Sequence, residues 1–365
     1  MGFLDTLKAK LLPKRKGIIG LDIGTDAILV ALVGQTKQGY VVEKLAWGPM
    51  PPDAFQDGEI TDPAGVGEVI RGILEDNGIT SNRAVVSIGG QSVIIRLINT
   101  ELMETDELET FLLTEAERYI PFSPDDVNIS SQIVGNSTDD GGNPQLDVLL
   151  VAVQKHLVDS YLNAAQEASL SLNCVDVSSF AVMRALENMN YIDDTQSVAV
   201  LLVQGPATDI MVISGGAPRF NRSVLIGSGY MLDNLISSLG IDEDAARELW
   251  DQIDMEPQGY DELPPHVEQA TEIVRPALSE LTGEISRSLE FYMNQGGGAI
   301  DRIMICGRGA TLKGIDRFLA SRLGIEVVVA NPLTAVDFAD EAVDEAQAPA
   351  YVTAIGLSMR GLAGT

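Results

Sequence analysis

Cysteine and histidine are nearly absent from this chain of 365 residues, which contains two of each. Cys174 and Cys306 lie far apart in the sequence, so we expect no disulfide framework and a reducing compartment. His156 and His266 are equally isolated, and the chain therefore lacks the His/Cys cluster that a transition-metal site requires. We expect each histidine at the surface or in an interface.

Positive charge is also scarce. The chain has 24 Lys and Arg residues against 53 Asp and Glu residues, which gives a formal net charge of -29. Such a charge repels a phosphate backbone, so nucleic acid is not expected as a partner. Basic partners are favoured instead.

Long hydrophobic runs are missing as well. No stretch approaches the ~20 apolar residues of a membrane-spanning helix, and nothing resembles a secretory signal, so we expect a protein that is cytosolic or lies on a membrane surface. Residues 1–16 combine apolar residues at helical spacing with the basic residues 14–16, which is typical of a membrane-surface helix. A frayed tail and a partner-docking helix remain alternatives for this segment.

Hydrophobic residues make up 45% of the chain, which is enough for two domains. Residues 18–32 contain two apolar, strand-prone runs around Gly24, with Asp22, Thr25 and Asp26 beside it, and they predict a buried hairpin. Its turn could hold a phosphate, because glycine exposes backbone N–H groups, Thr25 adds a hydroxyl and Asp22 could hold a hydrated Mg²⁺. Alternatively, Asp22 only bonds its own turn.

The same strand, turn, strand pattern returns at residues 198–213, with Gly205 and Thr208 in the turn. This indicates an internal duplication of architecture, and two such halves facing each other would close a cleft. Residues 226–231 place glycines between a strand and a helix, which is a second candidate anion site. Residues 307–314 repeat that arrangement, where a base or ribose could approach the backbone.

Residues 84–177 predict a small inserted α+β module of paired strands, an acidic helix and a polar loop. Its helix, expected over residues 106–119, ends at the sequence I-P-F-S-P, where two prolines fix the backbone. Tyr119, Ile120 and Phe122 are poorly placed there for burial in a helix. They mark either a binding groove or a packing plug between helix and strand.

The order of these glycine turns resembles the superfamily of actin, heat-shock chaperones and sugar kinases, in which two lobes surround ATP. Its phosphate 1, connect 1, phosphate 2 and adenosine motifs would fall at residues 22–25, 178–185, 202–208 and 307–314. The resemblance narrows to the PilM family of type IV pilus assembly proteins through four segments and covers residues 17–361. These segments are E-A-E-R-Y-I-P-F-S-P-D-D-V-N (115–128), L-L-V-A-V-Q-K (149–155), E-I-S-R-S-L-E-F-Y (284–292) and C-G-R-G-A-T-L-K-G (306–314).

This resemblance implies an α/β, actin-like (ribonuclease H-like) two-lobed fold with an FtsA-type inserted 1C subdomain. The expected division of the chain follows the same family. It comprises an amphipathic segment (1–16), subdomain 1A (17–83), inserted subdomain 1C (84–177), a return to 1A (178–197), subdomain 2A (198–230), subdomain 2B (231–299), 2A again (300–336), and an acidic loop with a helix back to 1A (337–365).

The resemblance also implies ATP or ADP with Mg²⁺ as the cofactor. The residues expected to bind the nucleotide are Asp22, which would also hold the metal, Gly24, Thr25, Gly205, Thr208, Gly227, Ser228, Gly229, Glu284, Arg287, Gly307, Gly309 and Ala310. Three departures from the family pattern oppose hydrolysis. Leu202 replaces the phosphate 2 aspartate, Leu29 replaces a lysine, and Arg308 interrupts the adenosine Gly-Gly. Leucine cannot coordinate a metal, so we expect ATP turnover near background.

As partners, the resemblance implies the cytoplasmic tail of the membrane protein PilN and the pilus motor ATPases, with the chain on the inner face of the bacterial inner membrane. The groove for the tail is expected at Val86, Ile88, Ile94, Arg96, Tyr119, Ile120, Pro121 and Phe122. An extended peptide could add to a strand edge there, and an acidic wall would favour its cations. Membrane contact through residues 1–16 and self-association are left open.

The favoured function is therefore that of an adaptor in the pilus assembly platform. One alternative is an FtsA-type filament or a secretion-system scaffold, which the fold by itself does not distinguish. Another is a small-molecule kinase, which would need a catalytic carboxylate acting on a substrate hydroxyl, and the sequence identifies none.

Overall fold

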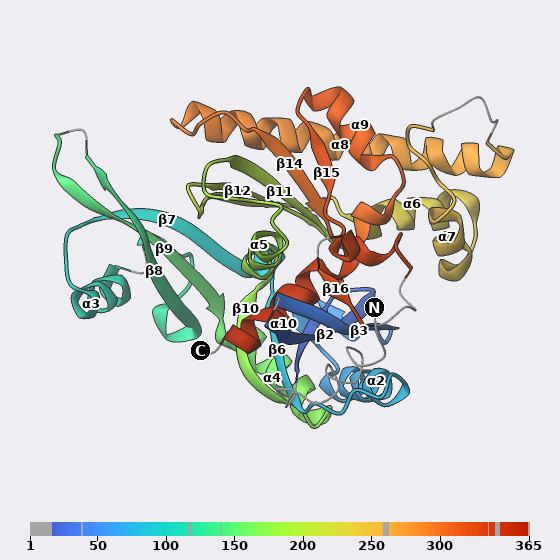
Figure 1. Cartoon of the computed structure of the whole chain (residues 1–365), viewed down its shortest axis with the longest axis horizontal. Coiled ribbons are helices and arrows are strands. Elements are labelled where there is room, and N and C mark those ends of the chain that lie inside the picture. Colours follow the sequence, from blue (N-terminus) through green and yellow to red (C-terminus); the bar gives the residue numbers. More distant parts are fainter. Residues whose placement is uncertain are drawn as a thin grey trace.

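The computed structural model describes residues 17–37, 39–115, 118–139, 141–257, 263–334, 336–339 and 344–363. The amphipathic segment predicted at residues 1–16 lies outside these ranges, as does part of the acidic loop predicted near the end of the chain. Figure 1 shows two sheets, one above the other, and a long strand module that projects to one side. No helix within the described ranges has the length and apolarity that crossing a membrane would require.

The first lobe contains a six-stranded sheet whose spatial order is β10-β6-β1-β2-β3-β16. Strands β1, β2 and β3 are antiparallel neighbours, whereas β6 and β10 continue parallel to β1. The strands are β1 (Ile18–Ile23), β2 (Ala27–Thr36), β3 (Gly39–Pro49), β6 (Arg83–Ile88), β10 (Ser171–Val177) and β16 (Asp337–Phe338). A two-stranded hairpin, β4 (Phe55–Gln56) and β5 (Glu59–Ile60), lies beside the sheet.

The second lobe repeats this arrangement in a five-stranded sheet with the order β13-β12-β11-β14-β15. The strands are β11 (Ser197–Val203), β12 (Thr208–Ser214), β13 (Ala217–Val224), β14 (Arg302–Cys306) and β15 (Val327–Val329). Three antiparallel strands are again followed by two parallel ones, as in β3-β2-β1-β6-β10. The predicted duplication of architecture is therefore confirmed.

The two hairpins correspond residue by residue, because each closes with the same turn. The Gly24 N–H donates to the Ala27 carbonyl in the first hairpin, and the Gln204 N–H donates to the Ala207 carbonyl in the second. Counting back from these turns, Asp22 of β1 and Leu202 of β11 occupy equivalent positions. The second hairpin does carry a carboxylate, but on the opposite strand, since Asp209 pairs with Leu202.

The helices of the first lobe cover both faces of its sheet. On one face α5 (Ser178–Asn188) and α10 (Val352–Ala363) pack against each other, and α10 also packs against β1. Glycine permits this closeness, because a Cβ at Gly20 would lie 1.8 Å from the Ala354 carbonyl oxygen. On the other face lie α2 (Pro63–Asp76), which begins after an Asp62 N-cap as its sequence predicts, and α4 (Lys155–Glu167).

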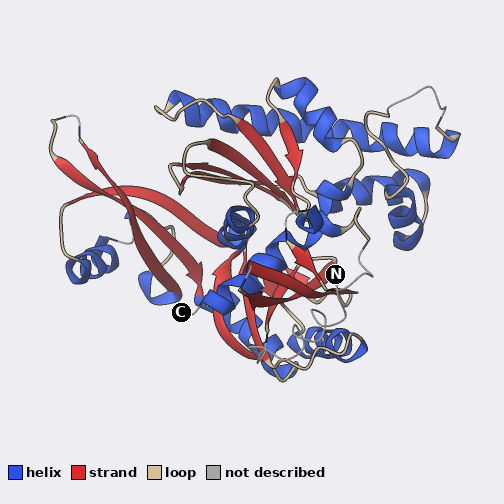
Figure 2. Ribbon diagram, in the orientation of Figure 1, coloured by secondary structure: helices blue, strands red, loops and turns tan. Residues whose placement is uncertain are grey.

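The second lobe has its own helices on one side of its sheet, where they build the largest apolar core. They are α6 (Ser228–Leu239), α7 (Glu243–Trp250), the long α8 (Pro265–Asn294) and α9 (Ile315–Leu323). Figure 2 shows α8 crossing the outer side of the strands. A 3-10 turn, η4 (Arg308–Thr311), follows β14 and brings the chain back toward the first lobe.

The projecting module is a three-stranded sheet with the order β7-β9-β8 and one helix. Its elements are β7 (Val93–Glu101), α3 (Thr105–Glu115), β8 (Val127–Thr138) and β9 (Pro144–Gln154). Along β9 the faces alternate: Leu150 and Ala152 belong to the small core that includes α3, whereas Val151 and Val153 pack toward the first lobe. The two faces of this module therefore have different neighbours.

Candidate functional site

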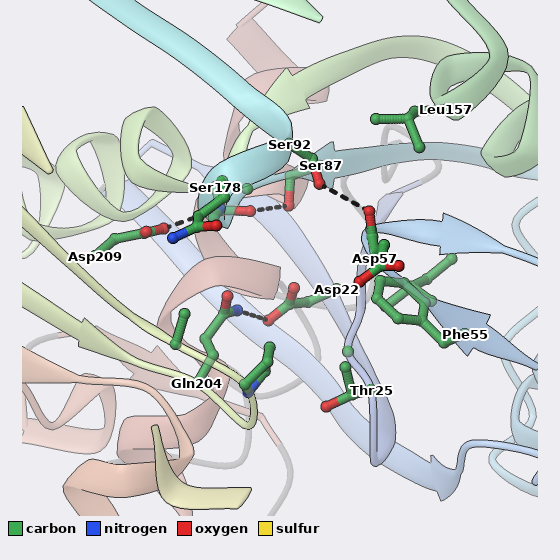
Figure 3. A pocket seen from close by; sticks show the side chains of 18 of the residues that line it. Asp22, Thr25, Phe55, Asp57, Ser87, Ser92, Leu157, Ser178, Gln204 and Asp209 are labelled. Atoms are coloured by element: carbon green, nitrogen blue, oxygen red, sulfur yellow. Dashed lines mark hydrogen bonds between the residues drawn. The ribbon is translucent and has the colours of Figure 1, made fainter. Parts of the chain in front are cut away.

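A cavity of about 320 Å³ lies between the two lobes. Its walls come from both hairpins, from the connection between β6 and β7, from the β4–β5 turn and from the starts of α4 and α5. Figure 3 shows the polar side chains that point into it. We call this space the interlobe cavity.

Asp22 lies in one wall of the interlobe cavity, almost completely buried on β1. Its Oδ2 accepts a hydrogen bond of 3.4 Å from Gln204 Nε2, so this contact joins the two lobes. Burial raises the pKa of Asp22 to about 7, and the neighbouring Asp26 charge contributes to that shift. The carboxyl group is therefore partly protonated at neutral pH.

Asp209 is a second buried carboxylate in the wall, and its side chain is only 5% exposed. Its Oδ2 accepts from the Gly90 N–H at 3.2 Å, which again joins the lobes. The carboxyl group also faces the Ser223 hydroxyl across the β12–β13 pair, and this hydrogen bond favours its ionised form. Burial raises the pKa of this carboxyl group as well. Our sequence reasoning missed Asp209, although a single charge in the otherwise apolar strand after Thr208 was a usable signal.

Two serines and a third carboxylate complete the polar lining of the interlobe cavity. Ser178, at the start of α5, donates a hydrogen bond of 3.0 Å to the Ser87 hydroxyl of β6. Asp57 adds a third carboxylate at an exposed position. No Lys, Arg or His belongs to the set of described residues that lines the cavity. The interlobe cavity is thus acidic and offers no cationic side chain to an anion.

The predicted glycine turns do converge, around the end of β11. A Cβ at Gly205 would lie 2.5 Å from Thr25 Oγ1, and one at Gly229 would lie 2.7 Å from the Gly205 carbonyl oxygen. A Cβ at Gly309 would meet the Val203 side chain at 2.2 Å. The turns therefore lie against each other instead of leaving a gap between them.

The backbone amides that would bind a phosphate already have protein partners. The N–H groups of Ser228 and Gly229 donate to the carbonyls of Gln204 and Gly205, each at 2.8 Å. The Gly307 N–H likewise donates to a backbone carbonyl, that of Pro349. Thr208 is fully buried, and its hydroxyl donates to the Ile226 carbonyl at 2.6 Å. The contacts of Ser228, Gly229 and Thr208 hold the second lobe together, and the Gly307 contact joins that lobe to the segment that leads into α10.

A carboxylate occupies the space beside these turns. Asp26 Oδ2 lies 3.1 Å from Arg308 Nε and 3.6 Å from an Arg247 guanidinium nitrogen, so the first hairpin is held to two arginines of the second lobe. A polyphosphate entering here would have to displace Asp26 and separate Thr25 from Gly205. The residues between the hairpins therefore do not fit a nucleotide polyphosphate in this conformation.

Glu284 and Arg287, predicted to contact the nucleotide, lie on α8 away from the interlobe cavity. Arg287 pairs with Glu284 at 2.5 Å, and Glu284 also pairs with Arg222 of β13 at 3.0 Å. The Arg287 side chain is largely exposed. Of the predicted nucleotide-binding residues, only Asp22, Gly24 and Thr25 line the cavity, while Gly227, Gly307, Gly309 and Ala310 belong to the packed turns.

A second, larger hollow of about 920 Å³ lies between the projecting module and the lobes. Consecutive residues 128–134 of β8 form one wall, and β10 with α5 forms the opposite wall. The turn between β12 and β13, residues 215–218, closes one side. We call this hollow the module groove. Ile133 and Leu162 are exposed apolar side chains within it.

Of the residues predicted to line a partner groove, only Ile88 lines the module groove. Val86 and Ile120 are 1% and 3% exposed and belong to apolar cores, so their contact with a partner stays a prediction that would require these side chains to become accessible. Ile94 and Arg96 pair with Ala152 and Leu150, which places them on the α3 face of the module.

The remaining three predicted groove residues, Tyr119, Pro121 and Phe122, follow α3. Tyr119 packs against the core of the module, whereas Pro121 and Phe122 are exposed. None of the three lines the module groove. We call residues 119–122 the α3 corner, and this corner and the module groove are separate surfaces.

Comparison with known proteins places the fold. A solved structure described as a PilM-PilN type IV pilus biogenesis complex is 26% identical, covers 95% of this chain and 99% of its own, and gives a TM-score of 0.82. The ethanolamine utilization protein EutJ from Carboxydothermus hydrogenoformans is 16% identical over 94% of this chain and 89% of its own, with a TM-score of 0.56. MreB 5 of Spiroplasma citri bound to AMPPNP is 14% identical over 96% and 97%, with a TM-score of 0.53.

The similarities to EutJ and MreB 5 show only that this chain has the actin-like fold. The family model described as type IV pilus assembly protein PilM matches residues 20–362 of this chain. That range includes both hairpins except the first two residues of β1, the projecting module, and α10 except its last residue. The chain belongs to the type IV pilus assembly protein PilM family.

Proposed function

We propose that this chain is an adaptor of the type IV pilus inner-membrane assembly platform, which binds the cytoplasmic tail of PilN and links it to the pilus motor ATPases. The observation that carries this proposal is the module groove, because an exposed strand edge forms one of its walls. In this proposal the chain lies at the inner face of the membrane because its partner is anchored there.

The edge of β8 is suited to an extended peptide. β8 is the last strand of its sheet, and no strand in the described part of the chain pairs with its outer edge. A peptide added there would gain backbone hydrogen bonds, and its alternate side chains would reach the groove. Ile133, 40% exposed, and Leu162 on α4 offer apolar contacts on either side.

The net charge of the chain, and not that of the module groove, favours a basic tail over an acidic one. Two carboxylates, Asp176 of β10 and Glu187 of α5, and two guanidinium groups, Arg184 and Arg360, line the groove, and Arg184 pairs with Asp176 at 2.9 Å. The exposed Glu187 is therefore the wall carboxylate that can meet a cation of the tail. The net charge of -29 adds a long-range attraction that speeds encounter more than it raises affinity.

The module groove is built by both lobes, which supports a role in transmitting a signal. Its third wall, residues 215–218, belongs to the second lobe. Arg219, next to that wall, contacts Asp147 of β9 at 3.4 Å and so ties the module to the second lobe. A change in the angle between the lobes would therefore change the shape of the groove.

ATP turnover has no part in this proposal. Leu202 stands at the position equivalent to Asp22, and Asp26 holds the arginines that a phosphate would need. Nucleotide binding would require the two hairpins to separate. An adaptor can instead work through its contacts alone.

A binding titration of the full chain with a fluorescent peptide of the PilN cytoplasmic N-terminal tail tests the proposal. We expect Ile133→Asp to weaken binding at least tenfold, because it puts an unpaired charge into the apolar part of the module groove. Phe122→Ala is the matched control, since Phe122 is also exposed on the module but lies outside the groove. We expect it to bind as the wild type does.

If Phe122→Ala weakened binding and Ile133→Asp did not, the tail would bind at the α3 corner instead. No binding by the wild type would reject the adaptor proposal and would favour the filament or kinase alternatives. A pull-down of the motor ATPases with and without PilN then tests the second contact.

A further inference from the structure

Residues 1–16 contain a disproportionate share of the positive charge of this chain. Five of its 24 Lys and Arg residues lie in this segment, whereas only one of its 53 Asp and Glu residues does. The five cations are Lys8, Lys10, Lys14, Arg15 and Lys16. The net charge of the whole chain is -29, so an anionic surface repels most of the chain and attracts this segment.

The apolar residues of this segment, which lies outside the described ranges, have the spacing of one helix face. With about 100° between successive residues, four of them would form a stripe about 100° wide, namely Phe3, Leu4, Leu7 and Leu11. Lys8 and Lys10 would flank this stripe on its two sides. Lysines at such positions reach lipid headgroups with their long side chains while the apolar face enters the acyl boundary. The pattern therefore predicts a helix that lies in the plane of a membrane surface.

Pro13 separates this predicted helix from the folded part of the chain. Since proline disfavours the helical conformation of the residue before it, we expect the helix to end near Leu12. The three cations at positions 14–16 follow directly and lead into Gly17. Basic residues next to a membrane-bound segment are attracted by the negative potential of anionic lipids. An apolar face and a basic cluster thus act together, which reversible membrane binding requires.

The described residues fix the place where this segment joins the fold. The Gly17 carbonyl accepts a hydrogen bond of 2.7 Å from the Ser81 hydroxyl. A Cβ at Gly361 would lie 2.4 Å from Ile18 Cγ2, so α10 packs closely against the start of β1. From this point β1 runs to the turn at Gly24, which lines the interlobe cavity. Residues 1–16 therefore join the first lobe at the end of β1 that is remote from that cavity.

The β10 wall of the module groove lies toward the other end of the same sheet. β6 and β10 run parallel to β1, and the groove is lined by the last three residues of β10, 175–177. These residues pair with residues 86–88 of β6, at the end toward which β1 runs. This separation allows a lipid surface and a peptide in the module groove to be bound at the same time.

We propose that residues 1–16 bind an anionic phospholipid surface as an amphipathic helix, with residues 14–16 at the level of the headgroups. This contact goes beyond the adaptor role, because it attaches the first lobe to the membrane without PilN. Cations on both sides of the apolar stripe suit a flat interface with charged headgroups on each side of the helix. The preference for anionic lipid comes from this segment, since the remainder of the chain is repelled.

Co-sedimentation of the full chain with phospholipid vesicles tests the proposal. We expect binding to phosphatidylcholine vesicles that contain one-quarter phosphatidylglycerol to be at least tenfold tighter than binding to phosphatidylcholine alone. Leu7→Asp should weaken binding to the anionic vesicles at least tenfold, because it places a charge in the apolar stripe. Leu102→Asp is the matched control. Leu102 is 58% exposed on the projecting module, so this variant adds the same charge elsewhere and should bind as the wild type does.

A variant that combines Lys14→Gln, Arg15→Gln and Lys16→Gln tests the contribution of charge. We expect it to bind anionic vesicles at least fivefold more weakly and neutral vesicles as the wild type does. Two further measurements separate this inference from the adaptor proposal. Leu7→Asp should bind the PilN tail peptide as the wild type does, and Ile133→Asp should bind vesicles as the wild type does.

The inference would be overturned by equal binding of the wild type to both kinds of vesicle, by binding to neither, or by unchanged binding in Leu7→Asp. Binding only to vesicles that contain PilN would make residues 1–16 a protein-docking segment and would overturn it as well.

Discussion

Asp26 and Arg308 form an ion pair that joins the two lobes, with 3.1 Å between Asp26 Oδ2 and Arg308 Nε. Asp26 comes from the turn of the first hairpin, and Arg308 interrupts the glycines after β14. Both side chains are about three-quarters buried, so the pair is shielded from solvent more than a surface pair is. The Asp26 carboxylate thus lies beside the glycine turns that the sequence predicts for a phosphate.

Breaking this pair is expected to lower the free energy of unfolding. In a double-mutant cycle with Asp26→Ala and Arg308→Ala, we expect a coupling energy of about 1 kcal/mol, measured by urea denaturation. The cycle is needed because Asp26 also contacts Arg247. The exposed pair Arg275–Glu272 on α8 is the control, and its coupling should stay below about 0.5 kcal/mol. Equal coupling in both cycles would contradict the shielding argument.

Asp22 should make stability depend on pH. Its pKa is about 7 in the folded chain against 3.8 for an ordinary carboxyl, so between these values the folded chain binds a proton that the unfolded chain has released. Stability therefore falls as pH rises from about 4 to about 7 and then levels off. Asp22→Asn should remove this slope and stabilise the chain at pH 8, by at most about 4 kcal/mol.

The measurement is the difference in unfolding free energy between Asp22→Asn and the wild type at pH 5 and at pH 8. Asp76→Asn corrects for the general loss of one negative charge. A difference that does not grow with pH would show that Asp22 ionises as an ordinary carboxyl.

Gly20 should not tolerate a side chain. A Cβ there would lie 1.8 Å from the Ala354 carbonyl oxygen and 2.6 Å from the Ser358 nitrogen, and both atoms are backbone of α10. We expect Gly20→Ala to cost about 3 kcal/mol of unfolding free energy, because α10 must move away from β1. Gly72→Ala in α2 is the control. No atom lies within 4 Å of its Cβ, so alanine should stabilise the helix by about 0.5 to 1 kcal/mol.

ATP hydrolysis is expected to stay at background in the wild type, because Leu202 cannot position a metal or a water molecule. A coupled phosphate-release assay measures this rate. A clear rate that Asp22→Ala abolishes would contradict the expectation.

Asp26→Ala should bind a fluorescent ATP analogue more tightly than the wild type does, since it removes a negative charge and releases Arg308 and Arg247.

Local patterns in the chain predicted much of this architecture. The apolar runs around Gly24 and around Gly205 became the two hairpins, and Asp62 caps α2 as its position before a proline indicated. These features depend on neighbours in the sequence, through alternation, turn chemistry and capping. The subdomain boundaries and the individual site residues stay predictions.

Local patterns did not show which residues of the projecting module share a surface. The sequence predicts Ile94 and Arg96 in one partner groove with Ile88, whereas in the structure they lie on the face of the module that packs toward α3. A strand pattern tells which residues share a face, but both faces of this strand are partly apolar. Which face meets a core depends on where α3 returns, and that is a contact between distant segments.

Alternation, turn chemistry and spacing were therefore sufficient for the duplicated hairpins and the inserted module, and the resemblance of four sequence segments indicated the family. Whether the glycine turns leave room for a phosphate was decided only by the packing of the lobes, which sets Thr25 against Gly205 and Asp26 against Arg308. The same packing buried Asp209 beside Gly90, far away in the sequence. Such contacts join segments that lie far apart in the sequence, and local patterns do not indicate which distant segments meet in space.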